Sequence, residues 1–244
     1  MRINNRIHLI GSGDYGFNLT NKYDCNIYLI DGGNSLALID AGAGIETERI
    51  INEIKDAGFD PLQVDFIFLT HAHADHAGGA YELSKQCDAV LYGLADTARF
   101  VSTGDTEAIS LSAAIKAGIY PSNYHFPSCP VTPINDGEKF QVGDLKIHAI
   151  ETLGHSDGHA SYYMEYAGKR CLFGGDLIFG GGKISLQATW DCRLTEYEQS
   201  IRKVSELKID SLFPGHFIFI CNDAHHHIET AVSQLNQLAI PKNI

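Results

Sequence analysis

The sequence predicts an α/β fold, and three of its features carry that prediction. Apolar runs such as residues 66–69 are short and uninterrupted, which is typical of strands buried on both faces. Segments with a helical repeat of apolar residues, such as 195–208, lie between these runs. Residues of metal-ligand type begin where several strands should end, and open α/β sheets bind ligands at that edge. We therefore expect a functional site at the ends of the strands.

The composition is that of an ordinary globular protein. Its 244 residues are 44% hydrophobic and 20% charged, which provides enough apolar material for a sizeable core. We expect a single domain over residues 1–244, because no internal repeat or low-complexity segment marks a second one. The net charge of −12 argues against a broad nucleic-acid-binding face, so we expect a small-molecule substrate and no nucleic acid.

The sequence shows no pattern of a membrane span, a secretory signal or a disulfide framework. No apolar run approaches the ~20 residues that a membrane span needs, and the N-terminus lacks the apolar stretch of a secretory signal. The six cysteines are scattered and form no C-x-x-C pair. We therefore expect a cytoplasmic protein without membrane attachment. The oligomeric state stays open, with a homodimer as one option.

The first part of the chain predicts a hairpin followed by a helix. Residues 5–10 form an expected strand, and the strand-like runs 25–30 and 35–40 flank a turn rich in glycine and asparagine. Residues 46–57 repeat isoleucines on one helical face, and Gly58 ends the helix.

A long segment over residues 96–133 follows an expected helix at 80–86 and a strand at 89–92. We predict that this segment is irregular, with a helix at 107–117 and several prolines after it. Long loops in compact domains are usually functional or mobile, so we interpret it as a lid over the site, with a structural insertion as the alternative.

The remainder alternates strands and helices again. The expected elements are strands at 144–151, 160–166, 170–173 and 209–213 and helices at 195–208 and 225–238.

The densest cluster of metal-ligand residues follows the strand at 66–69. His71, His73, Asp75 and His76 fall within six residues. Side chains two positions apart point about 200° apart on a helix but share one side of an extended segment. His71, His73 and Asp75 can therefore converge, whereas His76 points elsewhere unless the chain turns. This dense arrangement suits two adjacent metals better than one.

Three later strands each end in one further ligand-type residue, His155, Asp176 and His216. Each follows a glycine, which lets the backbone turn without steric cost. Together with the first cluster they make five histidines and two aspartates, a set that suits two zinc ions with one shared carboxylate.

In order, spacing and strand context these residues resemble the metallo-β-lactamase-fold hydrolases. The pattern is H-x-H-x-D-H at 71–76, then His155, then Asp176 after Gly-Gly, then His216 in Pro-Gly-His, and the resemblance extends back to residue 25. It implies a four-layer αββα sandwich, with two mixed β-sheets flanked by helices and the site at one edge of the sheets. The motifs around His155 and Asp176 look like those of glyoxalase II.

The resemblance also implies a role for each ligand. By position, the first metal would be held by His71, His73 and His155, the second by Asp75, His76 and His216, and Asp176 would bridge them. The ions would most readily be Zn²⁺, although iron and manganese accept the same ligands. They would share a hydroxide that attacks a small ester, thioester or lactone. Asp75 would act in catalysis by orienting this nucleophile and moving its proton.

Other polar residues carry two interpretations each. His159 is either structural or a hydrogen-bond partner close to the metals. Lys183, after three glycines, is a candidate for binding a substrate carboxylate or a solvated loop lysine. His226, in a run of three histidines, is a candidate substrate contact or part of a solvated helix terminus.

Rival functions on the same fold stay open. A persulfide dioxygenase would bind one iron through two histidines and an aspartate, and a phosphodiesterase would share the full ligand set. Antibiotic hydrolysis is disfavoured because β-lactamases of this fold generally lack the bridging aspartate that Asp176 would provide. The 28 residues after His216 are too few for the glutathione-binding domain of glyoxalase II. A binding or scaffold protein without activity is disfavoured by the intact ligand set.

Overall fold

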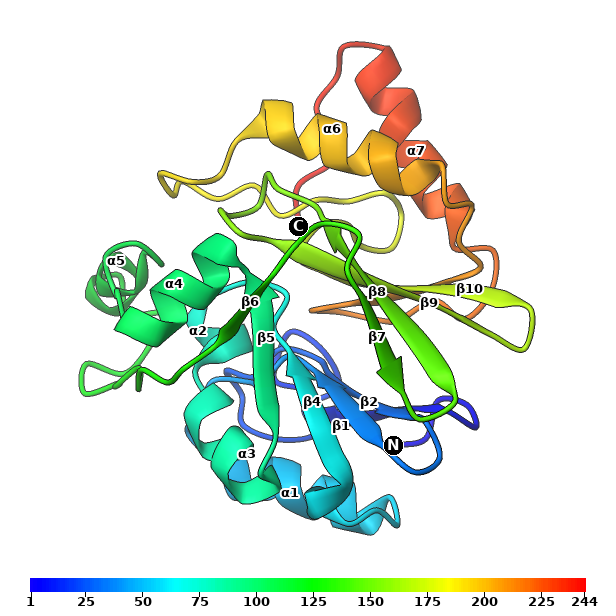
Figure 1. Cartoon of the computed structure of the whole chain (residues 1–244). Coiled ribbons are helices and arrows are strands. Elements are labelled where there is room, and N and C mark those ends of the chain that lie inside the picture. The colour runs from blue at the N-terminus through cyan, green and yellow to red at the C-terminus, as the bar shows by residue number, and fades with distance from the viewer.

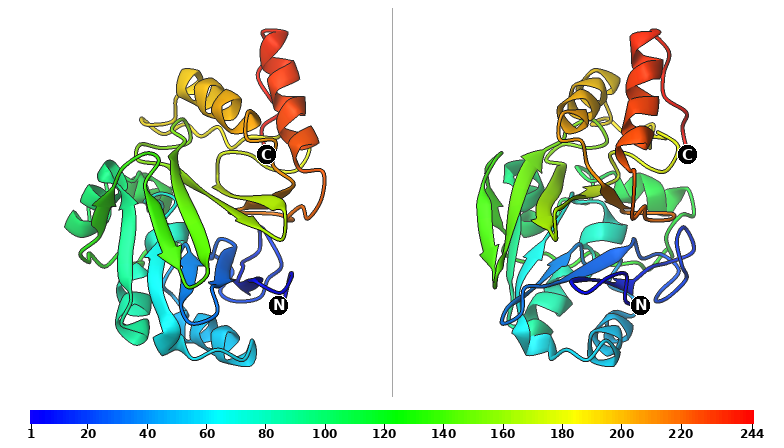
Figure 2. Two further views of the ribbon diagram at one scale, coloured as in Figure 1. Left: turned by 45° about the vertical axis from the view of Figure 1, so that its right-hand side comes forward. Right: turned by 90° about the vertical axis from the view of Figure 1, so that its right-hand side faces the viewer.

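Two β-sheets pack face to face, and helices cover the outer face of each sheet (Figures 1 and 2). The structure is a computed structural model that describes all 244 residues. Helices α1 and α3 lie below the first sheet in Figure 1, and α6 and α7 lie above the second. This arrangement is the predicted αββα sandwich, so the expected fold class is confirmed.

The first sheet has six strands in chain order, β1-β2-β3-β4-β5-β6. The first three are antiparallel neighbours, and β3 to β6 run parallel. The β2–β3 pair is the hairpin that the sequence predicts. The strands are β1 (Ile7–Gly11), β2 (Ile27–Asp31), β3 (Leu36–Ile39), β4 (Val64–Phe68), β5 (Val90–Leu94) and β6 (Thr132–Ile134).

The second sheet has five strands in the order β11-β10-β9-β8-β7. The β9–β10 hairpin is confirmed, and only the β10–β11 pair is parallel. The strands are β7 (Lys139–Val142), β8 (Leu145–Glu151), β9 (Ala160–Tyr166), β10 (Lys169–Gly175) and β11 (Ser211–Pro214).

Three apolar cores separate the four layers. One fills the space between the first sheet and its helices, one lies between the sheets, and one lies under α6 and α7. None of the helices combines the length and apolar character of a membrane span. The helices are α1 (Thr47–Asp56), a 3₁₀ turn (Pro61–Gln63), α2 (Ala74–Ala77), α3 (Ala80–Cys87), α4 (Ala95–Thr103), α5 (Leu111–Lys116), α6 (Leu194–Ser205) and α7 (His225–Asn236).

Hydrogen bonds join the two sheets at the edge that carries the ligand residues. The Ala160 amide at the start of β9 donates to Thr70 O beyond the end of β4 at 2.7 Å. The Tyr162 hydroxyl donates to the backbone oxygen of the preceding residue, Leu69, at 2.8 Å. The Tyr28 hydroxyl of β2 donates to Pro214 O of β11 at 2.8 Å. Strand ends from both sheets are therefore fixed next to each other.

The expectation of an irregular segment over 96–133 is wrong at both ends. Helix α4 begins at Ala95 directly after β5, so no turn residue marks the boundary in the sequence. Strand β6 contains Pro133, and an edge strand tolerates a proline because its outer N–H groups need no partner. Between them, α5 lies inside the helix predicted at 107–117.

Candidate metal centre

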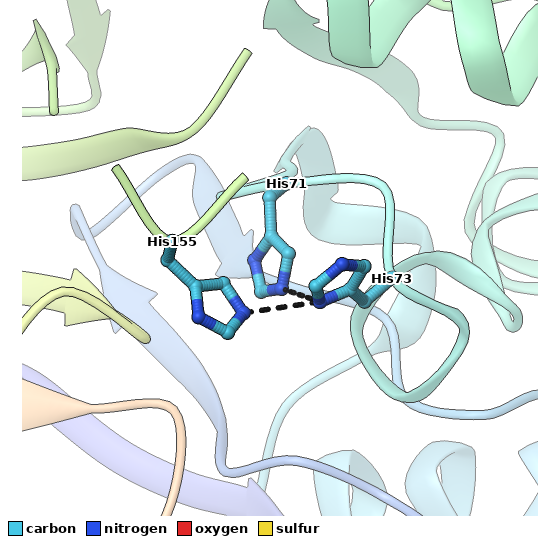
Figure 3. Close-up of side chains that lie close together, drawn as sticks. All are labelled: His71, His73 and His155. Atoms are coloured by element: carbon cyan, nitrogen blue, oxygen red, sulfur yellow. Dashed lines mark hydrogen bonds between the residues drawn. The ribbon is translucent and has the colours of Figure 1, made fainter. Parts of the chain in front are cut away.

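The first ligand group consists of His71, His73 and His155, whose ring nitrogens converge (Figure 3). His71 Nε2 and His155 Nε2 each lie 3.0 Å from His73 Nδ1. His71 and His73 lie just beyond β4, and His155 follows β8 in the second sheet. The group therefore spans both sheets.

Hydrogen bonds on the far side of two rings fix which nitrogen faces the centre. His155 Nδ1 lies 3.0 Å from Ser185 O, and a carbonyl can only accept, so the proton is on Nδ1. Thr70 Oγ1 lies 2.8 Å from an Asp40 oxygen, which takes its one proton, so Oγ1 accepts from His71 Nδ1 at 3.0 Å. Both Nε2 atoms therefore turn lone pairs toward the centre.

Lone pairs that converge on one point repel one another, and a cation between them would remove this repulsion. Zinc accepts imidazole nitrogens at about 2.0–2.1 Å, and a tetrahedral ion at that distance places its ligand nitrogens somewhat more than 3 Å apart. The 3.0 Å separations at His73 Nδ1 are close to that spacing. The residues present therefore fit a divalent metal.

The second ligand group consists of Asp75, His76 and His216. His216 Nε2 lies 3.1 Å from Asp75 Oδ2 and 3.3 Å from His76 Nε2. Asp40 Oδ2 lies 2.8 Å from His76 Nδ1 and accepts a hydrogen bond from it, which leaves His76 Nε2 to face the centre. This group combines one carboxylate with two imidazoles.

Asp176, at the end of β10, lies between the two groups. Its Oδ2 is 3.6 Å from His155 Nε2 and 3.4 Å from His216 Nε2, and its Oδ1 is 3.4 Å from His76 Nε2. Asp176 Oδ1 is buried and has no hydrogen-bond partner. A buried carboxylate oxygen is costly to leave unpartnered, so a cation is the ligand that this atom fits.

Two buried side chains hold the backbone of Asp176 in place. Its amide donates to His159 Nε2 at 3.1 Å, and the Tyr197 hydroxyl donates to its carbonyl at 2.6 Å. Both interpretations of His159 therefore apply. Its side chain has a structural role, and it is a hydrogen-bond partner of the candidate bridging residue Asp176.

Glycines before the ligands allow this close approach. A Cβ at Gly215 would lie 2.5 Å from Asp176 Oδ1 and 2.6 Å from a His76 ring carbon. Gly175 has φ +51°, and a Cβ there would lie 2.7 Å from His159 Nε2. Larger residues at either position would displace the carboxylate or its support.

Charge differs sharply between the two ligand groups. Burial lowers the pKa of His155 to about 4 and that of His71 well below its usual value, so these rings stay neutral. Burial also opposes protonation of His216, but the carboxylates of Asp176 and Asp75 outweigh it and raise its pKa to about 9. The imidazoles of the second group in turn lower the pKa of both carboxyls, which stay ionised.

The turn at Ala74 is what divides the first cluster between the two groups. His71 and His73 share a side of extended backbone, as the spacing predicts, but Asp75 does not join them. The chain turns into α2, which carries Asp75 and His76 toward His216. The spacing predicts that His76 reaches the site only if the chain turns, and the chain does turn at Ala74.

Two functional residues were missed by the sequence analysis. Asp40 orients His76, and its only signal is an acidic residue at the end of a buried strand. The Tyr120 hydroxyl donates to Asp75 Oδ1 at 3.2 Å from the segment after α5. No local pattern around Tyr120 indicates that contact.

A cavity of about 720 Å³ opens over the centre. His73, Asp75, Asp176 and His216 line it, so both ligand groups reach the same space. Lys183 and His226 are not among the lining residues, and the geometry gives no support to their predicted substrate contacts.

The sequence profile of the metallo-beta-lactamase superfamily matches residues 20–216. An uncharacterized protein of Aquifex aeolicus is 29% identical over 86% of this chain and 87% of its own length. An atrochrysone carboxyl ACP thioesterase of Aspergillus fumigatus is 25% identical over 78% of this chain. The match spans 37% of the length of that thioesterase.

Solved structures share the fold at low sequence identity. A metallo-beta-lactamase family protein of Thermus thermophilus superposes with a TM-score of 0.74 and 21% identity, covering 97% of this chain and 81% of that one. The profile match covers most of the chain and includes every ligand-type residue described above. The chain therefore belongs to the metallo-beta-lactamase superfamily.

Proposed function

We propose that this chain is a metal-dependent hydrolase with a dinuclear centre, most readily of zinc, that cleaves an ester, thioester or lactone bond in a small molecule. The observation that carries the proposal is the pair of ligand groups with Asp176 between them, one of whose buried oxygens has no partner. Four ligands line a cavity whose 720 Å³ falls within the range of about 300–1,000 Å³ typical of small-molecule sites.

Divalent ions held there would lower the pKa of water from about 16 to about 7 and polarise the bond to be cleaved. The chain's own residues would orient the reactants. Asp75 is ionised and faces the cavity, so its carboxylate can accept a hydrogen bond from a water molecule beside the substrate. The Tyr120 hydroxyl donates to Asp75 Oδ1, and its pKa is raised well above the usual value by burial, so the donor keeps its proton. Asp75 is thereby fixed in one orientation.

The comparisons support hydrolysis in general. Relatives include a protein named as a thioesterase and proteins named as lactamase-like. Cleavage of an acyl bond also fits a centre that can place a carbonyl carbon next to a fixed carboxylate. That the bond is an ester, a thioester or a lactone is part of the proposal.

The mononuclear iron alternative needs only two histidines and one aspartate. It leaves part of the second ligand group without a role, although His76 is held by its own carboxylate partner, Asp40. Such support is typical of histidines that bind metal. The second group therefore favours two ions and hydrolysis.

Metal content per chain tests the proposal directly. We expect about two zinc ions in the wild-type protein purified without added metal, and about one in His76→Ala. His125→Ala, which removes an exposed histidine outside the centre, is the matched control and should keep both ions. A wild-type protein with one iron that His76→Ala leaves in place would contradict the dinuclear proposal. Esters, thioesters and lactones would then be screened with the zinc-loaded protein, and turnover of none of them would contradict the hydrolytic assignment.

A further inference from the structure

One wall of the cavity, formed by α5 and the residues beside it, is largely apolar. Ile109 and Leu111 are buried at the start of α5 and face the cavity, and Ala113, Ala114 and Ala117 continue the same wall. The three alanines are small, so the space beside the helix stays open. Apart from the hydroxyl of Ser110, this wall offers contact area to an apolar group and no hydrogen bonds from its side chains.

A second segment, at residues 187–189, also lines the cavity. Gln187, Ala188 and Thr189 line it, and the next residue, Trp190, donates from Nε1 to Ala108 O at 2.9 Å. This hydrogen bond ties the second segment to the residues just before α5. The width of the cavity is therefore set by a direct contact between its two walls.

No lysine or arginine lines the cavity. Apart from the candidate metal ligands His73, Asp75, Asp176 and His216, no lining side chain is charged. A phosphate or carboxylate on a part of the substrate that lies against the walls away from the ligand groups would lose its hydration and find no cationic side chain in return. The net charge of −12 adds a repulsive background for anions.

The rim of the cavity is apolar as well. Tyr15, Ile119 and Ile244 line the cavity and expose 69%, 58% and 46% of their surface. Tyr15 lies edge-on to the ring of His216, with ring centroids 6.3 Å apart. Apolar surface that gathers at the mouth of a site marks a place where an apolar ligand emerges.

From these observations we propose that the cavity binds an apolar, uncharged acyl group, and that its walls select against acyl groups that end in a carboxylate. The proposal deepens the hydrolytic function and rests on it for the reaction. In that reaction water adds to the acyl carbonyl carbon, the bond from this carbon to sulfur or oxygen breaks, and the leaving thiol or alcohol takes a proton. The products are a carboxylic acid and a thiol or alcohol.

A matched pair of thioesters tests the selectivity. Octanoyl and suberyl thioesters of N-acetylcysteamine have the same leaving group and chain length, and the suberyl chain ends in a carboxylate. We expect kcat/KM to be about 100-fold higher for the octanoyl thioester, from the cost of leaving a carboxylate unpaired. Equal values for the two substrates would overturn the inference while leaving the hydrolase intact.

Variants of α5 test whether this wall is responsible. Ala117→Lys places a cation on the wall and should reduce the octanoyl preference about tenfold, whereas Ser112→Lys, on the same helix but outside the cavity lining, should leave it unchanged. Ala113→Trp fills the cavity and should lower the ratio of octanoyl to acetyl turnover about tenfold, with Lys116→Trp as its control. Equal effects of a cavity variant and its control would contradict the assignment of the wall.

A binding measurement separates this inference from the hydrolytic one. N-phenyl-1-naphthylamine, an uncharged fluorescent probe, should bind the protein and be displaced by octanamide at least about tenfold more readily than by the monoamide of suberic acid, which carries a carboxylate at the far end of a chain of the same length. This displacement without hydrolysis of any thioester would refute the hydrolase and keep the inference. Failure of the probe to bind, or equal displacement by the two amides, would refute the inference even if thioesters are cleaved.

Discussion

The two ligand groups sit side by side with Asp176 between them, yet the imidazoles of the two groups differ in charge. The first contains three imidazoles, and burial keeps His71 and His155 neutral. The second contains a carboxylate, and the acidic surroundings raise the pKa of His216 to about 9. The first group is therefore ready to donate lone pairs, whereas the second holds protons that a cation must displace.

Proximity to the same carboxylate, Asp176, therefore does not by itself set the charge of an imidazole. Asp176 lies within 3.6 Å of nitrogens from both groups. What differs is the number of carboxylates around each ring. His155 lies near Asp176 alone and faces a backbone carbonyl, whereas His216 lies between Asp75 and Asp176, and His76 also faces Asp40.

Removal of the shared carboxylate should have the largest effect. Asp176→Asn keeps the shape of the side chain but removes the charge that lies between the groups, so we expect zinc content to fall below two per chain and kcat/KM to fall by about 10³-fold or more. Elemental analysis and thioester hydrolysis measure the two effects, and circular dichroism controls for folding. An unchanged metal content would show that Asp176 is not shared.

The pH dependence of metal binding should separate the groups. The pKa of His216 is raised to about 9 and that of His76 is raised as well, so each unit of pH increase below pH 9 should raise the apparent affinity of the second group at least tenfold. His155, with a pKa of about 4, is already deprotonated at pH 6 and should add almost no dependence between pH 6 and 8. Zinc titrations at several pH values should show one affinity that rises steeply with pH and one that hardly changes. An equal pH dependence of the two affinities would contradict the difference in charge between the two ligand groups.

Loss of the Asp40 carboxylate should weaken the second group more than the first, which it reaches only through Thr70. Asp40→Asn takes away the acceptor for His76 Nδ1, and changes of this kind typically cost 10- to 100-fold in metal affinity. Competition with a chelator measures each affinity. Because Asp40 also accepts from the amide of Thr70, thermal unfolding of the metal-free variant checks that the fold persists. Equal weakening at both sites would mean that the substitution acts through the fold.

The smallest effect is expected at Tyr120. Tyr120→Phe removes the hydrogen bond to Asp75 Oδ1 while keeping the ring stacked on Tyr124, so kcat should fall roughly three- to tenfold with both zinc ions retained. Tyr124→Phe, which loses a bond to a backbone carbonyl instead, is the matched control and should change kcat less. A larger loss in the control would contradict an orienting role for Tyr120.

Much of the fold could be predicted because strand and turn signals are local. The hairpin of β2 and β3 follows from apolar runs on either side of a turn, and the glycines before His155, Asp176 and His216 mark where strands end. Helix α4 could not be placed, because it begins without any residue between it and β5.

The contacts that shape the site could not be predicted for a different reason. Tyr120 and Asp75 are 45 positions apart, and nothing near either residue specifies the other. The division of the ligands into two groups likewise depends on the turn at Ala74, which the residue spacing allows but does not require. The single-domain organisation and the lid interpretation stay predictions, although Ile109 to Tyr120 do contribute side chains to the cavity.

The position of the second ligand group between the two sheets has a consequence for stability. His76 and His216 are 140 positions apart and come from strand ends of different sheets, so an ion held between them would act as a crosslink between the two halves of the chain. A ligand that binds only the folded state raises the free energy of unfolding. The same ions that would serve the reaction would then brace the sandwich, and their removal by a chelator would let its two sheets separate at a lower temperature.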